Sequence, residues 1–176
     1  MSASDLDRDP IFVVQEHDAS AHHYDFRLEV DGVLKSWAVP KGPSLDPVDR
    51  RLAVEVDDHA LEHADFEGVA PPSRRGTGGV IIWDRGTYRN LHDGDGQDPL
   101  SMAESIGRGR VKVWLAGQKL RGGFTLIKTR LGGKDHNWLL KKLKDEEARD
   151  GVNVVGDEPR SVVSGRTMRE LLADEE

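Results

Sequence analysis

The chain has 176 residues, of which 36% are hydrophobic and 32% charged, and its formal net charge is −7. This length suits one domain with its own core, and the absence of cysteine excludes disulfides, thiolate metal sites and thiol nucleophiles. No apolar run reaches membrane-spanning length and residues 1–10 lack the features of a signal peptide, so a cytoplasmic location without a membrane partner is expected.

Short strand patterns dominate the first half of the chain. The run HHYDFRLEV (22–30) alternates polar and apolar residues and leads into Asp31-Gly32, a pair that suits a type I′ hairpin turn. A proline-rich loop is predicted at 40–47, and Asp84-Arg85-Gly86 indicates a further turn. The other strands of this half are predicted at 11–14, 33–39, 51–56 and 78–83.

The second half continues in the same way. Residues 110–130 suggest two strands around Gly117 with a further break at Gly122-Gly123, and 138–143 is the last predicted strand. Helices are predicted over 99–106 and 165–176, the second with a capping box of Thr167 and Glu170. Many short strands joined by Gly and Pro turns predict a mainly β fold, either a closed barrel or a sandwich, with a few short flanking helices.

The sequence predicts that the chain divides into three parts. These are a flexible N-terminal arm (1–10), a β domain (11–144), and a polar linker with the C-terminal helix (145–176). The turn-rich segment 145–161 is expected to be flexible. All four tryptophans lie in apolar strand patterns and are expected in the core: Trp37, Trp83, Trp114 and Trp138.

Basic residues are unevenly distributed. They cluster at Arg50-Arg51, at Arg74-Arg75, at Arg85 and Arg89, and from Arg108 through Arg121. A negative net charge argues against generic nucleic-acid binding, but this distribution allows a locally basic face.

One face of the predicted strand 22–30 carries His23, Asp25 and Arg27, while His22 is expected to face away. Same-face positions lie about 7 Å apart, so these three side chains can act on one site. The solvated face of an edge strand would look the same. Two further histidines argue against that interpretation. His17 lies in a predicted loop before this strand and His59 in a predicted loop after the strand 51–56, so both could contribute to the same site.

Histidine and aspartate together suit Mn, Fe or Zn as metal. Two ligand sets are open. One is His17, Asp25 and His59; the other is His23, Asp25 and His59, which matches the facial triad of non-haem iron oxygenases.

Three cations, Arg27, Lys41 and Arg51, favour a phosphoester substrate over an oxygenase reaction. A metal would polarise a phosphoryl oxygen or activate water, and the cations would neutralise charge on the phosphate oxygens. Arginine can hold two phosphate oxygens at once, whereas lysine acts as a point charge. A histidine beside the metal, such as His23, would serve as a general acid or hydrogen-bond donor.

The run FVVQEHDASAHHYDFRLEVDGVLKSWAVPKGPSLDP, followed by RLAVEVDDHALEHADFEG, closely resembles the 3′-phosphoesterase domain of bacterial DNA ligase D and its free-standing homologues. The resemblance continues through GTGGVIIWDRGTY and WLLKKLKD to the tail motif SVVSGRT. It implies a small closed β-barrel with an active site in its polar interior. Such a domain uses manganese to remove 3′-ribonucleosides and 3′-phosphates from DNA ends and leaves a 3′-hydroxyl.

The resemblance also implies roles for individual residues. Carried over position by position, His17, Asp25 and His59 would bind the metal, and the catalytic groups would be His23, Arg27, Lys41 and Arg51. Mn²⁺ is the expected cofactor, although the same ligands suit Zn²⁺ or Co²⁺. The expected partners are DNA 3′ ends in non-homologous end joining, together with a separate DNA ligase or end-binding protein, and the chain is expected to be a monomer.

Three places depart from the family pattern. His63 stands where tyrosine is common, Arg74 and Arg75 stand in a loop that usually has an acidic residue and a tyrosine, and Glu16 stands where a basic residue is common. His63, Arg74 and Arg75 are candidates for contacts with phosphate or DNA. If these changes removed turnover, the chain would be a DNA-end-binding subunit of the same fold, which is one alternative function; the iron oxygenase is the other.

Overall fold

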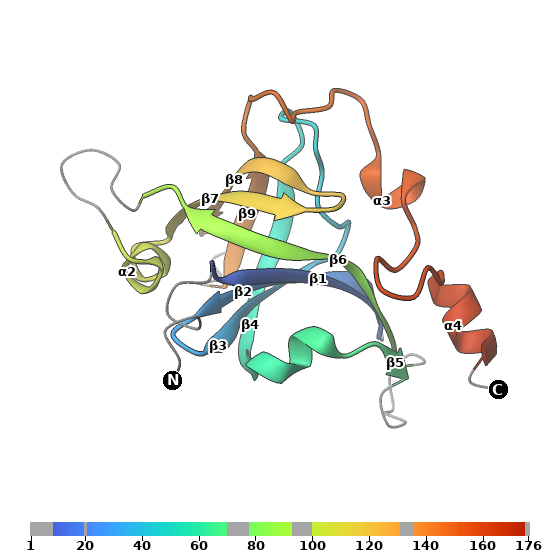
Figure 1. Ribbon diagram of the computed structural model, residues 1–176. Coiled ribbons are helices and arrows are strands. Elements are labelled where there is room, and N and C mark those ends of the chain that lie inside the picture. Colours follow the sequence, from blue (N-terminus) through green and yellow to red (C-terminus); the bar gives the residue numbers. More distant parts are fainter. Residues whose placement is uncertain (1–8, 20, 70–77, 93–99, 131–135, 175–176) are drawn as a thin grey trace.

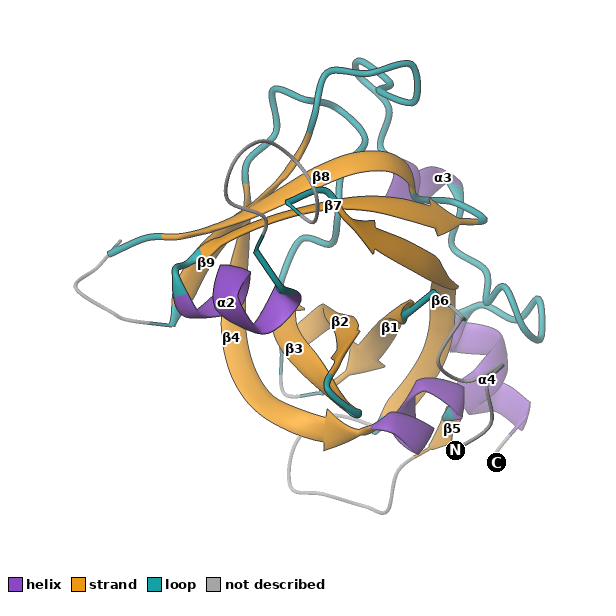
Figure 2. Cartoon of the chain, turned by 60° about the vertical axis from the view of Figure 1, so that its left-hand side comes forward, coloured by secondary structure: helices purple, strands orange, loops and turns teal. Residues whose placement is uncertain are grey.

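The computed structural model describes residues 9–19, 21–69, 78–92, 100–130 and 136–174. Within these ranges one antiparallel sheet has the strand order β1-β2-β3-β4-β9-β8-β7-β6-β5, and the pairing of β1 with β6 closes it into a barrel of eight strands (Figure 2). The predicted mainly β fold is therefore confirmed, as a barrel and not a sandwich. The strands are β1 (Ile11–Asp18), β2 (His22–Val30), β3 (Val33–Val39), β4 (Arg51–Ala60), β5 (Gly68–Val69), β6 (Gly79–Asn90), β7 (Arg110–Gly117), β8 (Arg121–Lys128) and β9 (Asn137–Lys142).

Short helical segments flank the barrel (Figure 1). They are the 3-10 helix η1 (Leu61–Asp65) and the α-helices α2 (Met102–Gly107), α3 (Val154–Asp157) and α4 (Met168–Asp174). Helix α2 begins at a capping box of Ser101 and Glu104. The capping box predicted for α4 is confirmed, because Thr167 Oγ1 accepts from the Glu170 amide and Glu170 Oε1 accepts from the Thr167 amide. The sequence pattern did not predict η1.

The interior of the barrel is apolar. Alternate residues of the strands meet there in one contiguous core, in which Trp37 and Trp138 pack edge to face with ring centroids 5.5 Å apart. Trp83 belongs to the same core, as predicted. The prediction for Trp114 is wrong, because its side chain is 38% exposed. On β7 the residues Val111, Val113 and Leu115 point inward, so the alternation turns Trp114 outward.

Two predicted breaks are absent and one turn is confirmed. Strand β6 continues through Asp84 and Gly86 without a turn. Asp84 is buried and accepts hydrogen bonds from backbone amides of the β7–β8 turn, including that of Leu120 at 2.8 Å. Gly86 permits close packing, since a Cβ there would come within 2.1 Å of the Ala116 carbonyl oxygen. The break predicted at Gly122-Gly123 lies inside β8, whereas Asp31-Gly32 adopts the expected positive φ angles of 51° and 84°.

The segment 145–161 packs against the barrel and is not the loose lead that its polar composition suggested. Its backbone is tied at several points: the Gly151 amide donates to Asp46 Oδ2 at 2.8 Å and the Arg149 amide to the Leu45 carbonyl at 2.8 Å. Trp83 Nε1 donates to the Glu158 carbonyl at 2.7 Å. The division of the chain at residue 145 stays a prediction. None of the described helices has the length and apolar character needed to span a bilayer.

Asp145 is expected to contribute to the stability of the barrel, because it neutralises a cation that the core encloses. The Lys142 side chain has no exposed surface, and its ammonium lies 2.6 Å from Asp145 Oδ1. We expect Asp145→Asn to lower the free energy of unfolding by about 1.5–3 kcal/mol, the usual worth of a hydrogen bond to a charged group. Urea denaturation measures this change, and Glu146→Gln at the neighbouring exposed position is the control. Equal stabilities of the two variants would contradict the prediction.

Candidate active site

The polar face of β2 lies on the outside of the barrel. His23, Asp25 and Arg27 alternate with the core residues Tyr24, Phe26 and Leu28, so they point away from the apolar interior. The polar interior that the family resemblance implied is therefore wrong for this chain. Because β1, β2 and β3 are neighbours, the outer faces of all three contribute to the same area.

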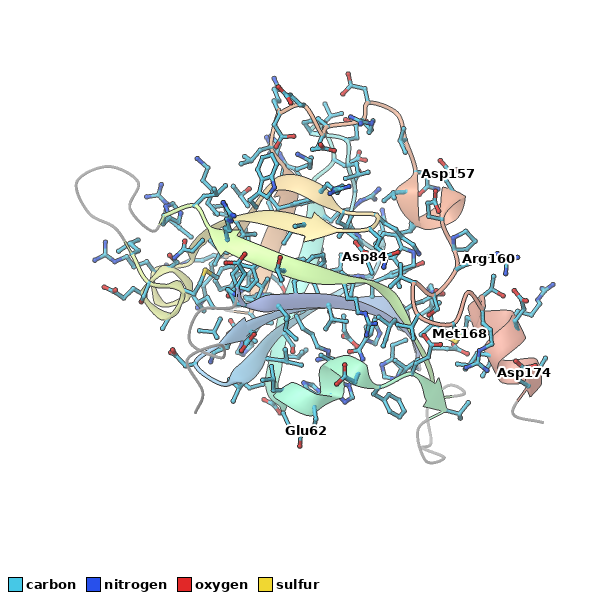
Figure 3. The ribbon with its side chains drawn as sticks, in the orientation of Figure 1. Glu62, Asp84, Asp157, Arg160, Met168 and Asp174 are labelled. Atoms are coloured by element: carbon cyan, nitrogen blue, oxygen red, sulfur yellow. The ribbon has the colours of Figure 1, made fainter. Side chains whose placement is uncertain are left out.

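Helix η1 forms one wall over this outer face. It lies against the outside of the sheet beside β1 and β2 (Figure 1), and Glu62 points from it away from the sheet (Figure 3). A small apolar cluster holds it there, in which Ala64 of η1 packs with Val13, Leu34 and Ile82 of the sheet. The wall is also hydrogen-bonded to the sheet, because Gln15 Nε2 donates to the carbonyls of His63 and Phe66.

A pocket of about 270 Å³ opens between this wall and the sheet. Phe66 and Val80 line it together with six residues of the predicted site: His17, His23, Asp25, Arg27, His59 and His63. Two of these were expected in loops but lie on strands, since β1 extends to Asp18 and β4 to Ala60. A register shift between β3 and β4 separates the pairs Ser36–Val56 and Leu34–His59, and this places His59 in the pocket.

Asp25 is the centre of the site. Its Oδ1 lies 3.1 Å from His23 Nε2, and its Oδ2 lies 3.6 Å from His17 Nδ1 and 3.2 Å from Arg27 Nη2. Burial by itself raises the pKa of the Asp25 carboxyl, but the contacts with His17 and His23 and the charge of Arg27 outweigh burial and hold the pKa well below its usual range. The pocket therefore contains a buried carboxylate at neutral pH.

The donor atoms of His17, His23 and Asp25 all lie within 4.8 Å of one another. Two imidazoles and a carboxylate form a donor set that suits divalent transition metals, so these residues fit the expected ion. This group shares His17 and Asp25 with the predicted ligand set but contains His23 in place of His59. Both sets use side chains of the same pocket.

His59 lies on the other side of the Arg27 guanidinium from Asp25. Its Nδ1 is 2.9 Å from Arg27 Nη1 and 3.0 Å from the Asp57 carbonyl oxygen. Arginine only donates and a carbonyl only accepts, so a neutral His59 satisfies one of these contacts at a time. When Nδ1 donates to Asp57, the lone pair of Nε2 is free for a metal. Burial and the charge of Arg27 lower the pKa of His59 and favour the neutral imidazole.

Arg27 is held rigidly by its surroundings. It donates to Gln15 Oε1 at 2.8 Å, to Ser36 Oγ at 2.8 Å and to Asp25 Oδ2 at 3.2 Å, in addition to the contact with His59. A guanidinium has five N–H groups, and the remaining one, on Nη2, has no partner among the described residues. Burial lowers the pKa of Arg27 while the charge of Asp25 raises it, and an arginine stays cationic in either case. Arg27 thus presents a fixed cation with one free N–H on Nη2, and with a second on Nη1 when His59 Nδ1 donates to Asp57.

The pKa values of the two remaining histidines of the pocket, His23 and His63, are shifted in opposite directions. His23 Nδ1 faces the Ala21 carbonyl at 2.9 Å, and the hydrogen bond to Asp25 raises the pKa of His23 against the effect of burial. His63 stacks on Phe66 with an interplanar angle of 13°, and burial together with the charge of Arg27 lowers its pKa to about 4. His63 is therefore neutral at pH 7 and offers an uncharged donor, as a tyrosine would.

The other predicted residues lie outside the pocket or outside the described residues. Lys41 follows β3 and is exposed, and Arg51 begins β4 with its Nη2 at 3.4 Å from Asp49 Oδ2. Neither is among the described residues that line the pocket. The register of β2, β3 and β4 nevertheless places both at the end of the barrel where His23 begins its strand. Arg74 and Arg75 lie outside the described residues.

Sequence reasoning missed Gln15, Ser36 and Phe66. The first two had a detectable signal, because Gln15 shares a strand face with His17 and Ser36 pairs directly with Arg27 across β2 and β3. His22 faces away from the pocket as predicted, and its Nε2 contacts Glu16 Oε2 at 2.7 Å.

The tail motif 161–167 is fixed to the pocket wall through Glu67, the residue after Phe66. Glu67 Oε1 accepts from the Ile82 amide at 2.8 Å and from the Ser161 hydroxyl, and Arg166 Nη2 lies 3.6 Å from Glu67 Oε2. The tail thereby restrains the segment that carries Phe66 and His63.

Comparison with known proteins identifies the family. The model of the DNA ligase D 3′-phosphoesterase domain matches residues 15–128. The multifunctional non-homologous end joining protein LigD of Pseudomonas aeruginosa is 51% identical over 159 residues, which cover 89% of this chain and 18% of the relative. The multifunctional non-homologous end joining DNA repair protein LigD of Mycobacterium tuberculosis is 44% identical over 138 residues, 77% of this chain and 16% of the relative.

The chain thus spans less than a fifth of the length of these curated relatives, and the match covers the residues that form the pocket. The resemblance stated from the sequence is confirmed: the chain belongs to the DNA ligase D 3′-phosphoesterase domain family.

Proposed function

We propose that this chain is a divalent-metal-dependent phosphoesterase that removes 3′-phosphates and 3′-ribonucleosides from DNA ends and leaves a 3′-hydroxyl, as a step of non-homologous end joining. The observation that carries the proposal is the pocket in which the buried Asp25 carboxylate meets His17, His23 and Arg27. Membership of the DNA ligase D 3′-phosphoesterase domain family and the similarity to non-homologous end joining proteins supply the DNA context.

The metal ligands of the proposal are His17, Asp25 and His59, with Mn²⁺ as the ion. When bound, such an ion supplies a Lewis acid for a phosphoryl oxygen and lowers the pKa of bound water. Asp25 supplies the negative charge that a divalent cation needs, and its low pKa keeps it ionised without assistance from the metal. The Asp57 carbonyl orients His59 by accepting from its Nδ1.

The remaining polar side chains act on the phosphate itself. The free N–H on Arg27 Nη2 binds one phosphate oxygen, and its rigid neighbours Gln15 and Ser36 make this donor preorganised. His23 holds a proton on Nε2, from where it can reach the oxygen of the leaving group. Lys41 and Arg51, at the rim of the same barrel end, stabilise the charge of the terminal and neighbouring phosphates.

The proposal is tested with two primer-templates, one ending in a 3′-phosphate and the other in a single 3′-ribonucleotide. With Mn²⁺ present, we expect wild type to convert both to a 3′-hydroxyl, as seen on a denaturing gel. His23→Ala is expected to remove this activity because the leaving group loses its proton donor. The matched control is His22→Ala, one residue away on the opposite face of β2, which is expected to keep wild-type activity.

Other outcomes lead to the alternatives. Wild type that binds both substrates and converts neither is an end-binding subunit without turnover, and this result contradicts the enzymatic proposal. If wild type and His23→Ala convert the substrates equally well, His23 is not the proton donor, but the protein is still a 3′-phosphoesterase.

A further inference from the structure

Glu67 is a buried carboxylate that joins three separate parts of the chain. Its side chain is only 8% exposed, and Oε1 accepts from the Ile82 amide of β6 and from the Ser161 hydroxyl of the tail motif. Its Oε2 lies 3.6 Å from Arg166 Nη2. Burial raises the pKa of the Glu67 carboxyl, but the hydrogen bonds from Ser161 and from the Ile82 amide and the charge of Arg166 outweigh burial and lower it. Glu67 is therefore an anion at neutral pH, and its partners fix its position.

The tail motif also contacts the pocket wall through its backbone and through an apolar side chain. The Val162 amide donates to the Ile82 carbonyl at 2.9 Å, so the backbone of Ile82 is bonded to Glu67 through its N–H and to the tail through its C=O. The Val162 side chain packs against the apolar cluster that holds η1 on the sheet, to which Ala64 and Ile82 belong. The tail motif and the pocket wall therefore form one packed unit.

Gln15 connects this unit to the guanidinium of the pocket. Its Nε2 donates to the Phe66 carbonyl, which belongs to the peptide group shared with Glu67, at 3.0 Å, and to the His63 carbonyl at 2.9 Å. Because both protons of the amide are used in this way, Oε1 faces the other direction, where it accepts from Arg27 Nε at 2.8 Å. Gln15 has no exposed surface, so bulk water does not compete for these bonds. The orientation of the guanidinium thus depends on the position of two carbonyls in the wall.

From these contacts we propose that Glu67 is a positioning residue for Arg27, which acts through the Phe66 carbonyl and Gln15 and is itself held by the tail motif. Glu67 is not among the described residues that line the pocket, so its effect on a substrate passes through other side chains. The inference rests on the proposed function where it concerns the phosphate. The free N–H on Arg27 Nη2 is preorganised for a phosphate oxygen only while Gln15 keeps its orientation.

The first test observes Arg27 without substrate or metal. Exchange of the Arg27 Nε–H proton with water, followed by heteronuclear NMR, reports the hydrogen bond to Gln15, because a proton donated to a buried acceptor exchanges slowly. We expect Glu67→Ala to speed this exchange by about tenfold, which corresponds to the loss of one hydrogen bond. The indole N–H of Trp138, which donates to Glu55 Oε1, is the internal reference and is expected to exchange as in wild type.

The matched control is Glu62→Ala, which removes an acidic side chain from the same wall. Glu62 is exposed and points from η1 away from the sheet (Figure 3), so this variant is expected to exchange the Arg27 proton as wild type does. Glu67→Gln keeps an acceptor for the Ile82 amide and the Ser161 hydroxyl, and it is expected to restore slow exchange. If thermal unfolding shows that Glu67→Ala is not folded, Ser161→Ala, which removes the hydroxyl that donates to Glu67, takes its place and is expected to speed the exchange in the same direction.

The second test measures the consequence for the reaction. With Mn²⁺ and the primer-template that ends in a 3′-phosphate, Glu67→Ala is expected to lower kcat by about 100-fold, a loss that a displacement of about 1 Å in an active site can cause. Its affinity for Mn²⁺ is expected to stay that of wild type, since the described contacts of Glu67 include none of the proposed metal ligands. Added to Gln15→Ala, the same substitution is expected to lower kcat no further, because residues that act through one another are not additive.

The two proposals fail in different ways. If Glu67→Ala leaves the exchange of the Arg27 proton unchanged, or speeds that of Trp138 equally, Glu67 does not position Arg27 and the inference is overturned, whether or not wild type releases phosphate. A further loss of kcat when Glu67→Ala is added to Gln15→Ala contradicts the path through Gln15. If the exchange of Arg27 alone is faster while wild type releases no phosphate with Mn²⁺, the positioning of Arg27 stands and the enzymatic proposal fails.

Discussion

Asp25→Asn is expected to abolish 3′-end processing and to lower the free energy of unfolding by about 3–5 kcal/mol, the cost of leaving one partner of a buried ion pair uncompensated. Asp25 and Arg27 are buried side by side, and their side chains are 7% and 4% exposed. The amide of asparagine keeps the shape of the carboxylate but removes its charge. Arg27 then stays buried without a counter-ion, and the donor cluster loses its anionic ligand.

Two measurements check this prediction. Urea denaturation gives the change in stability, and Tm with and without Mn²⁺ reports metal binding, because an ion that binds only the folded state raises Tm. We expect Mn²⁺ to raise the Tm of wild type and to leave that of Asp25→Asn unchanged. Asp58→Asn, whose partner Lys35 is at the surface, is the control and is expected to cost less than about 1 kcal/mol. An Asp25→Asn protein that keeps both activity and the Mn²⁺ response would refute the central role of Asp25.

Alternation along the strands was enough to predict most of the barrel. It separated the two faces of β2 correctly, and applied to β7 it places Trp114 outside with Arg110 and Lys112. The prediction of a buried Trp114 failed because the preference of tryptophan for the core was given more weight than the period of the strand.

The failed turn predictions have a tertiary cause. Asp84 and Gly86 belong to residue types that favour turns. Here the Asp84 carboxylate satisfies backbone amides of a distant turn, and Gly86 lets β6 and β7 approach closely. Both demands come from chain segments at least 30 residues away, so a local pattern does not contain them.

The sequence predicted several residues of the site, but not the location of the site on the outer face of the barrel. The residue types and their spacing identified His23, Asp25 and Arg27 as one group, and the structure places His17 and His59 with them. The location on the outer face depends on η1, five residues without helical periodicity that a small apolar cluster holds against the sheet. The contacts of the tail with Glu67 also join segments far apart in the sequence.

His17→Ala is expected to weaken Mn²⁺ binding by at least about 100-fold, since removal of a partner outside the ligand shell alone costs about 10- to 100-fold. His17 belongs to the geometric cluster and to the predicted ligand set alike. Isothermal titration of the apo-protein with Mn²⁺ measures the affinity, and His22→Ala is the control. The oxygenase alternative uses His23, Asp25 and His59, and it requires that His17→Ala bind the metal as wild type does.

The third ligand is decided by His59→Ala and His23→Ala in the same titration. Both ring nitrogens of His23 already face acceptors, the Ala21 carbonyl and Asp25 Oδ1, so an ion that takes Nε2 has to displace the contact with Asp25. His59 needs only to direct Nδ1 to Asp57 to free its Nε2. We therefore expect His59→Ala to lose affinity as His17→Ala does, and His23→Ala to keep affinity while it loses activity. The reverse pattern would assign the ion to His17, His23 and Asp25, and it would leave His59 as a partner of Arg27 that helps to orient the guanidinium toward the phosphate.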